Sequence, residues 1–304
     1  MIAIVGVGAI GGVCAARLGA VRDDLLCCVR HPFVRLQLRA PDGEWTCAPR
    51  LATDPTAVDA VDWVLLATKA HQIPGAAPWL EALLAAGSRL AVLQNGVEHV
   101  ARVSAWVESG RVVPVVVDCP ATAVAPGRIE QRRGARLVVP DDEGGRGFAS
   151  LFAGTAVDVV PTRDWTTAAW QKLCINAVGG ALSALAGRPL AEVRHPRRAE
   201  LARALADECG AVARAVGARL DAEFCAGVAR RAVGSGAVGR PSILVDRLAG
   251  RPLEVDARNG AVVRIGARCG IDAPVNRRAC ALLADAHLDP DEDRLPALLP
   301  ALSS

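Results

Sequence analysis

The stretch Ile2-Ala-Ile-Val-Gly-Val-Gly-Ala-Ile-Gly-Gly12 joins a short apolar run to a glycine-rich turn. The apolar run has the composition of a central parallel strand, and residues 13–18 continue with helical periodicity. Gly6, Gly8 and Gly11 therefore form a G-x-G-x-x-G pattern in a strand–turn–helix setting, the context in which that pattern is informative. It predicts that the chain begins with a dinucleotide-binding unit of the Rossmann type.

The glycines have different structural tasks in such a unit. Gly6 permits a tight turn, Gly8 lets the backbone approach a pyrophosphate, and Gly11 lets the helix pack closely on the strand. Ala9 and Ile10 open the helix, whose unpaired N–H groups and partial positive charge attract phosphate. We expect all of these residues to bind the dinucleotide.

The residue after the second predicted strand bears on the choice of cofactor. Residues 25–29 are an apolar run that predicts this strand, and Arg30 and His31 follow it. Sites that prefer NAD place an acidic residue here to hold the ribose 2′-hydroxyl. An arginine pairs with a 2′-phosphate instead, so Arg30 favours NADPH. The alternative is an ordinary surface arginine.

Two further strands, predicted at 61–67 and 89–94, lead into polar residues. Lys69 follows the first strand and Asn95 follows the second. Open α/β sheets bind ligands at the carboxyl ends of their strands. Both side chains are therefore candidates for contacts with the cofactor or the substrate. The alternative for Lys69 is a solvated loop residue.

The pattern of elements changes near Thr162, because strands are predicted before it and only helices after it. This indicates the α/β class, with an N-terminal Rossmann domain over residues 1–162 and an all-α C-terminal domain over residues 163–304. In the first domain we expect a hairpin formed by 36–39 and 44–48, a helix at 148–152 and a last strand at 156–160. Three short strands, at 112–117, 128–131 and 136–139, are expected to complete the sheet in antiparallel orientation.

The helical domain opens with an unusually apolar helix. Residues 173–187 include no charged side chain, and Lys172 stands just before them. At 100° per residue, Lys172, Asn176, Gly180 and Ser183 fall on one narrow stripe. Burying an amine and an amide is unfavourable unless both are paired, so the stripe indicates a ligand site. The alternative is a lysine that extends to solvent beside one satisfied, buried asparagine.

The rest of the second half predicts further helices, at 199–216, 222–232, from 241 onward, 259–269 and 275–287. The glycine-rich stretch 233–240 is expected to be mobile. The tail from Asp289, which has three prolines, is expected to be poorly ordered.

Composition argues against several other classes of function. The net charge is only +3, and four Phe, six Trp and no Tyr provide no basic and aromatic platform for nucleic acid. The ten cysteines lack C-x-x-C spacing, which predicts a reducing compartment and no metal. No apolar run reaches about 18 residues, so we expect no membrane span and a cytoplasmic protein. Monomer and homodimer both remain open.

Five motifs occur together along the chain. They are the glycine turn at 6–12, T-K-A-H-Q at 68–72, L-Q-N-G-V at 93–97, W-Q-K-L-C-I-N at 170–176, and P-S-I-L-V-D with G-R-P-L-E-V-D between 241 and 256. This set resembles the ketopantoate reductase family, the NADPH-dependent 2-dehydropantoate 2-reductases of pantothenate biosynthesis. The resemblance extends over nearly the whole chain. It implies an NADP-dependent oxidoreductase whose partner is a small-molecule 2-oxo acid.

The resemblance also implies a role for each site residue. Lys172 would be the general acid that protonates the oxygen of the C2 carbonyl as a hydride arrives. Glu254 would orient the substrate, balance the charge of Lys172 and contact the cofactor; the alternative is a surface carboxylate. Ser242 would bind the substrate carboxylate, unless it only caps its helix. Asn176 would bind the polar end of the substrate, and Asn95 and Lys69 would lie beside the nicotinamide and the substrate.

The sequence departs from the family pattern at Gly180, where the family commonly has a second asparagine one turn after the first. The loss of that amide leaves the cofactor and the chemistry unaffected and puts the identity of the substrate in doubt. Another branched or aromatic 2-oxo acid is an alternative substrate. A non-catalytic NADPH-binding sensor is a second alternative, and chemistry like that of opine or glycerol-phosphate dehydrogenases is a third.

Overall fold

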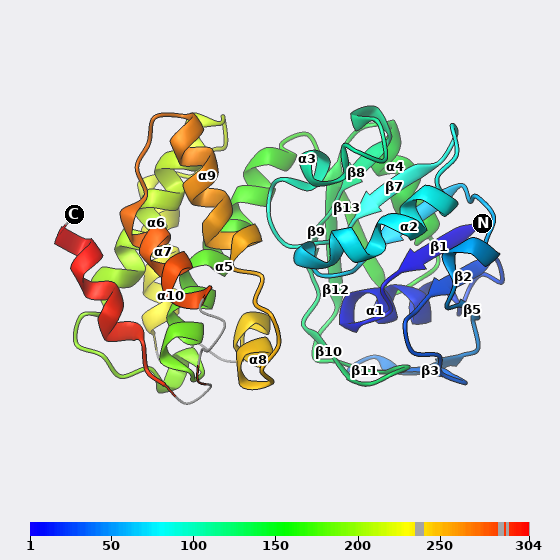
Figure 1. The fold of residues 1–304 in the computed structure, drawn as a ribbon, viewed down its shortest axis with the longest axis horizontal. Coiled ribbons are helices and arrows are strands. Elements are labelled where there is room, and N and C mark those ends of the chain that lie inside the picture. Colours follow the sequence, from blue (N-terminus) through cyan, green and yellow to red (C-terminus); the bar gives the residue numbers. More distant parts are fainter. Residues whose placement is uncertain (235–239, 285–288, 290–291, 304) are drawn as a thin grey trace. The chain divides into compact units, whose positions relative to one another are not determined.

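The computed structural model describes residues 1–234, 240–284, 289 and 292–303 (Figure 1). The chain divides into two compact units, Met1–Trp165 and Thr166–Ser304. The first is built on β-sheets and the second is helical. The predicted fold class, a Rossmann-type unit followed by an all-α unit, is confirmed.

The first unit is built on a six-stranded, all-parallel sheet in the order β5-β2-β1-β6-β7-β8. Its strands are β1 (Ile2–Val5), β2 (Leu25–Cys28), β5 (Arg50–Ala52), β6 (Trp63–Leu66), β7 (Arg89–Val92) and β8 (Val112–Pro114). The central strand β1 is buried on both faces, as its continuous apolar run predicts. The edge strand β5, three residues long, was not predicted from the sequence.

Helices cover both faces of this sheet. Ile4 shares one hydrophobic cluster with Val13 of α1, whereas Val5 shares a second cluster with Leu80 of α2. Successive residues of β1 thus face opposite layers, which is the doubly wound arrangement. The helices of this unit are α1 (Ala9–Leu18), η1 (Pro55–Ala57), η2 (Ala70–Gln72), α2 (Ile73–Leu83), α3 (His99–Val103), η3 (Ser109–Arg111) and α4 (Glu143–Leu151).

The expectation that the later short strands complete the main sheet in antiparallel orientation is wrong. Only β8 joins that sheet, and it pairs parallel to β7. The chain leaves the sheet after Pro114, whose nitrogen cannot donate to a continuing ladder. The other strands form two smaller sheets, β10-β11-β3-β4 and β13-β12-β9. Their bounds are β3 (Leu36–Ala40), β4 (Gly43–Cys47), β9 (Val116–Asp118), β10 (Ala121–Ala125), β11 (Arg128–Gln131), β12 (Ala135–Pro140) and β13 (Val157–Thr162).

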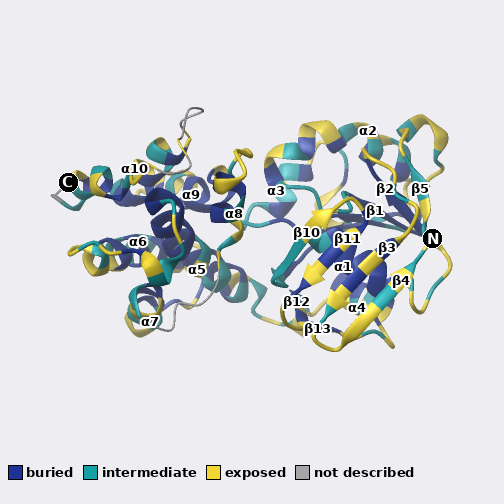
Figure 2. Ribbon diagram, turned by 90° about the horizontal axis from the view of Figure 1, so that it is seen from below, coloured by how far each residue is buried: buried dark blue, intermediate teal, exposed yellow. Residues whose placement is uncertain are grey.

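The predicted hairpin is confirmed as β3 and β4, which pair antiparallel around Gly43 at φ +140°. Exposed and buried residues alternate along β3 and β11 (Figure 2). Their buried face covers α1, because a Cβ built on Gly12 would lie 2.6 Å from the side chain of Ile129 in β11.

The second unit packs its helices around α5 (Trp165–Ala186), whose residues 177–186 are all buried (Figure 2). The predicted helices are present with small shifts at their ends. They are α6 (Arg198–Ala215), α7 (Ala222–Val233), α8 (Ser242–Leu248), α9 (Ala261–Arg268) and α10 (Pro274–Leu283), with the shorter η4 (Leu190–Glu192) and the π-helical turn η5 (Asp256–Gly260).

The tail differs from the expectation of poor order. Residues 295–303 form the helical segment η6, in which Leu295 and Leu298 are fully buried. The apolar spacing of this segment places both leucines on one face, and burial of that face holds the segment on the unit. The prediction of mobility for 233–240 falls mainly on residues 235–239, which lie outside the described residues, as do 285–288 at the end of the helix predicted to reach 287.

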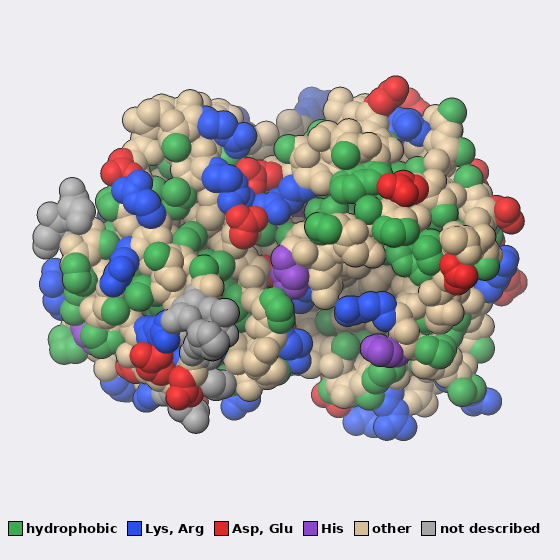
Figure 3. Space-filling model, in the orientation of Figure 1, with side chains coloured by type: hydrophobic (Ala, Val, Ile, Leu, Met, Phe, Trp, Pro, Cys, Tyr) green, Lys and Arg blue, Asp and Glu red, His purple; other side chains and the backbone are tan. Residues whose placement is uncertain are grey.

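Surface and composition features limit the kinds of ligand. Within the described ranges, no helix is long and apolar enough to cross a membrane, and no group of three or more His, Cys, Asp or Glu side chains is arranged to hold a metal ion. All ten cysteines are free thiols. Basic and acidic side chains are interspersed on the face drawn in Figure 3.

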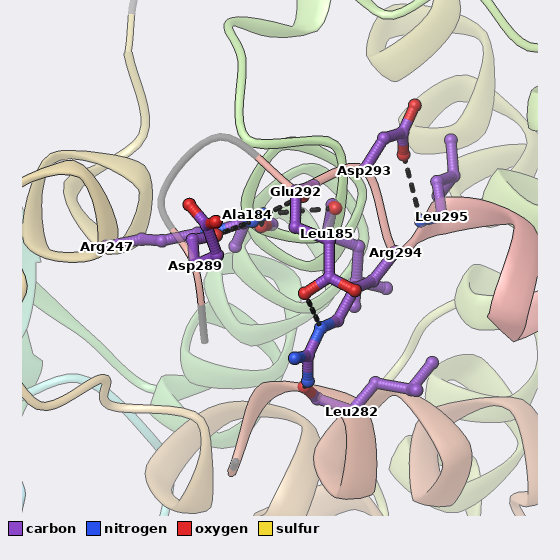
Figure 4. A network of polar contacts seen from close by, with 9 residues as sticks. All are labelled: Ala184, Leu185, Arg247, Leu282, Asp289, Glu292, Asp293, Arg294 and Leu295. Atoms are coloured by element: carbon purple, nitrogen blue, oxygen red, sulfur yellow. Dashed lines mark hydrogen bonds and ion pairs between the residues drawn. The ribbon is translucent and has the colours of Figure 1, made fainter. Parts of the chain in front are cut away.

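A buried arginine ties α8 to the end of α5 (Figure 4). The guanidinium of Arg247 donates to the carbonyl oxygens of Ala184 and Leu185, which end α5, and to those of Asp289 and Glu292. The last carbonyls of a helix lack partners within the helix, and Arg247 pairs with two of them. Arg247 thereby fixes the helix that begins at Ser242.

We expect Arg247→Leu to lower the free energy of unfolding by about 3 kcal/mol, because it leaves several buried carbonyls unpaired. The matched control is Arg203→Leu on α6, which removes only a surface pair with Asp207 and is expected to change stability by less than about 0.5 kcal/mol. Urea unfolding of both full-length variants measures the difference. Equal stability of the two variants would contradict the role assigned to Arg247.

Candidate active site

The parallel register brings the predicted cofactor residues to one edge of the main sheet. Val5 of β1 pairs with Cys28 of β2 and with Leu66 of β6, and Leu66 pairs with Val92 of β7. These strands therefore end side by side, and the loops that follow them lie along the carboxyl edge. That edge is where doubly wound sheets bind ligands, next to the strand at which the chain order reverses.

The glycine turn has the tight turn predicted at Gly6 and the close helix packing predicted at Gly11. Gly6 has φ +92°, and a Cβ there would lie 2.7 Å from the side chain of Thr68. A Cβ on Gly11 would lie 2.1 Å from the carbonyl oxygen of Gly6. Helix α1 therefore approaches the end of β1 so closely that only glycine fits at position 11. Gly6 and Gly11 are thus needed for the fold itself.

Gly8 is different, because a Cβ built on it would meet no described atom within 4 Å beyond its chain neighbours. It is exposed at the N-cap of α1, and no side chain caps the helix there. Ala9 and Ile10 begin the first turn, where N–H groups lack partners within the helix. A bare backbone at an uncapped helix start fits the pyrophosphate of a dinucleotide.

The remaining predicted cofactor residues lie along the same edge. Arg30 is exposed two residues beyond the end of β2, and Lys69 and Asn95 are half-buried in the loops after β6 and β7. Gln94, which was not selected from the sequence, links these two loops. Its amide nitrogen lies 3.1 Å from Thr68 Oγ1 and 3.4 Å from the carbonyl oxygen of Lys69, and donates to both.

His99 fixes the same loop from beneath. Its Nε2–H donates to the carbonyl oxygen of Gln94 at 2.9 Å, and its ring packs edge-on against Trp165 at 5.5 Å between centroids. His99 is fully buried, and burial lowers its pKa to about 4. It is therefore a neutral residue that holds the backbone next to Asn95.

In the second unit, the stripe on α5 has two parts. Lys172 and Asn176 are half-buried, whereas Gly180 and Ser183 are fully buried. Ser183 donates its hydroxyl to the carbonyl oxygen of Arg188 at 2.7 Å, so it is satisfied inside the unit. Ile175, between Lys172 and Asn176, is 43% exposed. Of this stripe, only Lys172 and Asn176 are thus open to a ligand.

The structure brings two predicted residues together through a third that the sequence did not reveal. Arg258 donates from Nη2 to Ser242 Oγ at 2.8 Å, and the same atom lies 3.8 Å from Glu254 Oε2. Glu254 and Arg258 are each only 2% exposed. Glu254 is therefore no surface carboxylate. Burial lowers the pKa of Arg258, while the carboxylate of Glu254 opposes that shift.

Arg258 lies in η5, a π-helical turn of a kind found at functional sites. Its neighbour Asn259 is fully buried and donates to the carbonyl oxygen of Ala177 in α5 at 3.1 Å and to Asn276 Oδ1 at 2.9 Å. Asn276 donates in turn to Glu208 at 2.7 Å. This polar chain holds η5 against α5, two residues beyond Glu254. These residues are far apart in the sequence, so no local sequence pattern predicts that they pair.

A parallel sheet with a bare glycine turn at its carboxyl edge, joined to a helical unit with an amine, an amide and a carboxylate, defines a dinucleotide-dependent oxidoreductase. The chain belongs to the ketopantoate reductase family. The family model "Ketopantoate reductase PanE/ApbA" matches residues 2–144, and its C-terminal counterpart matches residues 164–287. The family resemblance, the enzyme class, an NADP-dependent oxidoreductase acting on CH–OH groups, and the cofactor, NADPH, are confirmed.

Relatives and solved structures agree with this membership. A 2-dehydropantoate 2-reductase of Caulobacter vibrioides is 42% identical over 290 residues, covering 94% of this chain and 99% of its own. One of Mycobacterium tuberculosis is 40% identical over 291 residues, covering 95% and 98%. A ketopantoate reductase structure from Ralstonia eutropha JMP134 has a TM-score of 0.83 at 28% identity, covering 93% and 97%. A D-mandelate dehydrogenase with NADH has a TM-score of 0.83 at 18% identity, covering 99% of each chain, a likeness of fold alone.

We expect Gly8→Ala to fold normally, because the added methyl meets no described atom and φ is −85°. The methyl would stand where the pyrophosphate must approach, so the dissociation constant for NADPH should rise roughly tenfold or more, about 1.4 kcal/mol. Fluorescence titration with NADPH measures it. Gly75→Ala is the matched control, since its Cβ is also unobstructed but lies on α2. Unchanged NADPH binding by Gly8→Ala would contradict the assignment.

His99 should make stability depend on pH. Its pKa is lowered to about 4 in the folded chain, against about 6.5 when unfolded. Between these values the unfolded chain binds the extra proton, so stability is present above pH 6.5 and is lost as the pH falls toward 4. From pH 7 to pH 5 the loss should be about 2 kcal/mol. Calorimetry of wild type and His99→Gln isolates this part, and an equal pH dependence in both would refute it. A substitution of exposed His71 is the control.

Proposed function

We propose that this chain reduces 2-dehydropantoate to D-pantoate with NADPH, the reductive step of pantothenate biosynthesis. The observation that carries the proposal is that Lys172 and Asn176 are half-buried and lie one turn apart on α5, just before its fully buried residues 177–186. It lies within the C-terminal family match over 164–287. Relatives 40–42% identical to this chain are named 2-dehydropantoate 2-reductases.

The first unit supplies the cofactor half of the proposal. The backbone of Gly6, Gly8 and Gly11 with the start of α1 would hold the pyrophosphate, and Arg30 would pair with the 2′-phosphate that distinguishes NADPH. Lys69 and Asn95 would contact the nicotinamide and the substrate from the neighbouring loops. Bound NADPH supplies the hydride for the C2 carbonyl carbon.

The second unit supplies the proton and the substrate contacts. The ammonium of Lys172 would donate its proton to the carbonyl oxygen as the C–H bond forms, leaving a 2-hydroxy acid and a neutral amine that water reprotonates. Its charge stabilises the developing oxyanion before the transfer is complete. Asn176 would bind the polar end of the substrate, and Ser242 its carboxylate. Glu254 would orient the substrate and reach the cofactor.

Position 180 bears on which 2-oxo acid is the substrate. Gly180 offers no side-chain amide, and the guanidinium of Arg258 lies beside it, with Nη1 3.1 Å from the position of a Cβ. Because position 180 lacks the amide, another branched or aromatic 2-oxo acid is the second candidate. The chemistry is the same for both substrates, so a panel of 2-oxo acids separates them by their kcat/KM values.

We expect Lys172→Ala to lower kcat by about 10²- to 10⁴-fold, because the proton donor and its charge are lost together. The loss of absorbance at 340 nm with NADPH and 2-dehydropantoate measures turnover. NADPH affinity should be unchanged. Gln171→Ala, one position away on the same helix and half-buried like Lys172, is the matched control. A wild type that binds NADPH but turns over no 2-oxo acid would instead support the sensor alternative.

A further inference from the structure

Arg258 is a buried cation that has no assigned role in the proposed reaction. Its side chain is 2% exposed and reaches three elements of the second unit, namely Ser242 at the start of α8, Glu254 before η5, and Gly180 of α5. Its Nε has no hydrogen-bond partner among the described residues. A buried guanidinium left partly unpaired is unfavourable, so its presence calls for a functional explanation.

The hydrogen bond to Ser242 sets the polarity of that hydroxyl. A guanidinium has only donors, whereas a serine hydroxyl has one donor and two acceptor lone pairs. Since Arg258 Nη2 donates to Ser242 Oγ at 2.8 Å, the oxygen acts as the acceptor in this pair. The single O–H of Ser242 is then turned toward other partners and can donate to an anion. Without Arg258 the hydroxyl could rotate and present a lone pair instead.

The charge of Arg258 makes the neighbourhood of Glu254 compatible with an anionic ligand. The two side chains are 3.8 Å apart between Nη2 and Oε2, and both are buried. A buried carboxylate repels a substrate carboxylate strongly in such surroundings. The adjacent guanidinium offsets the charge of Glu254, so that the carboxylate of a substrate is tolerated beside it.

The absence of a side chain at Gly180 makes room for this arrangement. A Cβ there would lie 3.1 Å from Arg258 Nη1 and 3.2 Å from Ile243 Cγ2. Both contacts are tighter than ordinary van der Waals distance, so a larger residue would push against the guanidinium and Ile243. The guanidinium of Arg258 therefore occupies space that is available because position 180 is glycine.

We propose that Arg258 is a positioning residue for the substrate carboxylate, acting through Ser242, whose hydroxyl it orients as a donor, and through Glu254, whose charge it neutralises. This inference rests on the proposed 2-oxo-acid reductase function. It assigns the selection of a carboxylate-bearing substrate to a side chain that does not itself touch the substrate.

The test is steady-state kinetics of the full chain with NADPH and either 2-dehydropantoate or its primary amide, which lacks the carboxylate charge. Arg258→Leu should raise KM for the acid about tenfold to hundredfold and change kcat by no more than about threefold. The preference of the wild type for the acid over the amide should collapse. A merely structural role would raise both KM values alike. Arg258→Lys, which keeps the charge but loses the planar fork, should restore part of that preference.

A double-mutant cycle tests the route through Ser242. If Arg258 acts through that hydroxyl, Ser242→Ala should add little to the effect of Arg258→Leu, whereas independent roles would give additive effects. Additive effects, or an unchanged preference for the acid in Arg258→Leu, would overturn the inference. If Arg258→Leu does not fold, the Arg258→Lys and Ser242→Ala pair decides by the same criteria. Arg251→Leu, with a side chain 55% exposed, is the control.

The same assay separates this inference from the proposed function. If the wild type does not oxidise NADPH with any of the 2-oxo acids, the reductase proposal is wrong, and this inference is wrong with it. A wild type that is active, together with Arg258 variants that keep its KM values for acid and amide, would remove the inference alone. NADPH titration of each variant shows that the first unit remains intact, since Arg258 lies entirely in the second.

Discussion

The parallel register of the main sheet is the constraint on which the cofactor half of this protein depends. Val5, Cys28 and Leu66 end their strands side by side, so loops far apart in sequence must share one edge. The close approach of α1 at Gly11 closes the turn there, and the bare backbone at Gly8 remains for a ligand. The close contacts at Gly6 and Gly11 thus fix a turn in which the backbone of Gly8 stays open to a ligand.

Burial of polar groups is the corresponding constraint in the helical unit. Such groups are tolerated only when paired, and the unit pairs them by helix-to-helix hydrogen bonds rather than by solvent. Arg247 satisfies the carbonyls that end α5, and Asn259 donates to the carbonyl of Ala177 within it. Of the four residues on the polar stripe of α5, only Lys172 and Asn176 are not fully buried. The catalytic assignment follows from this exception.

Local pattern in the sequence predicted what depends on neighbouring residues. The glycine turn, the hairpin at Gly43 and the stripe on α5 were predicted because each has a short-range signal of spacing or turn chemistry. The sorting of later strands into separate sheets was not predictable, since pairing across the chain has no local signature. Arg258 was missed for the same reason, because its partners are 16 and 78 positions away at Ser242 and Gly180. The apolar spacing of η6 is present in the sequence, but prolines led to the prediction of a poorly ordered tail.

The central claim is that a hydride passes from NADPH to the C2 carbonyl carbon of a 2-oxo acid on this chain. The direct measurement uses NADPH fully deuterated at C4 of the nicotinamide, with mass spectrometry and NMR of the 2-hydroxy acid formed from 2-dehydropantoate. The account predicts one deuterium bound to C2 of the product and none at the hydroxyl after exchange in water. Product with hydrogen from solvent at C2, or the absence of any 2-hydroxy acid while NADPH is bound, would contradict it.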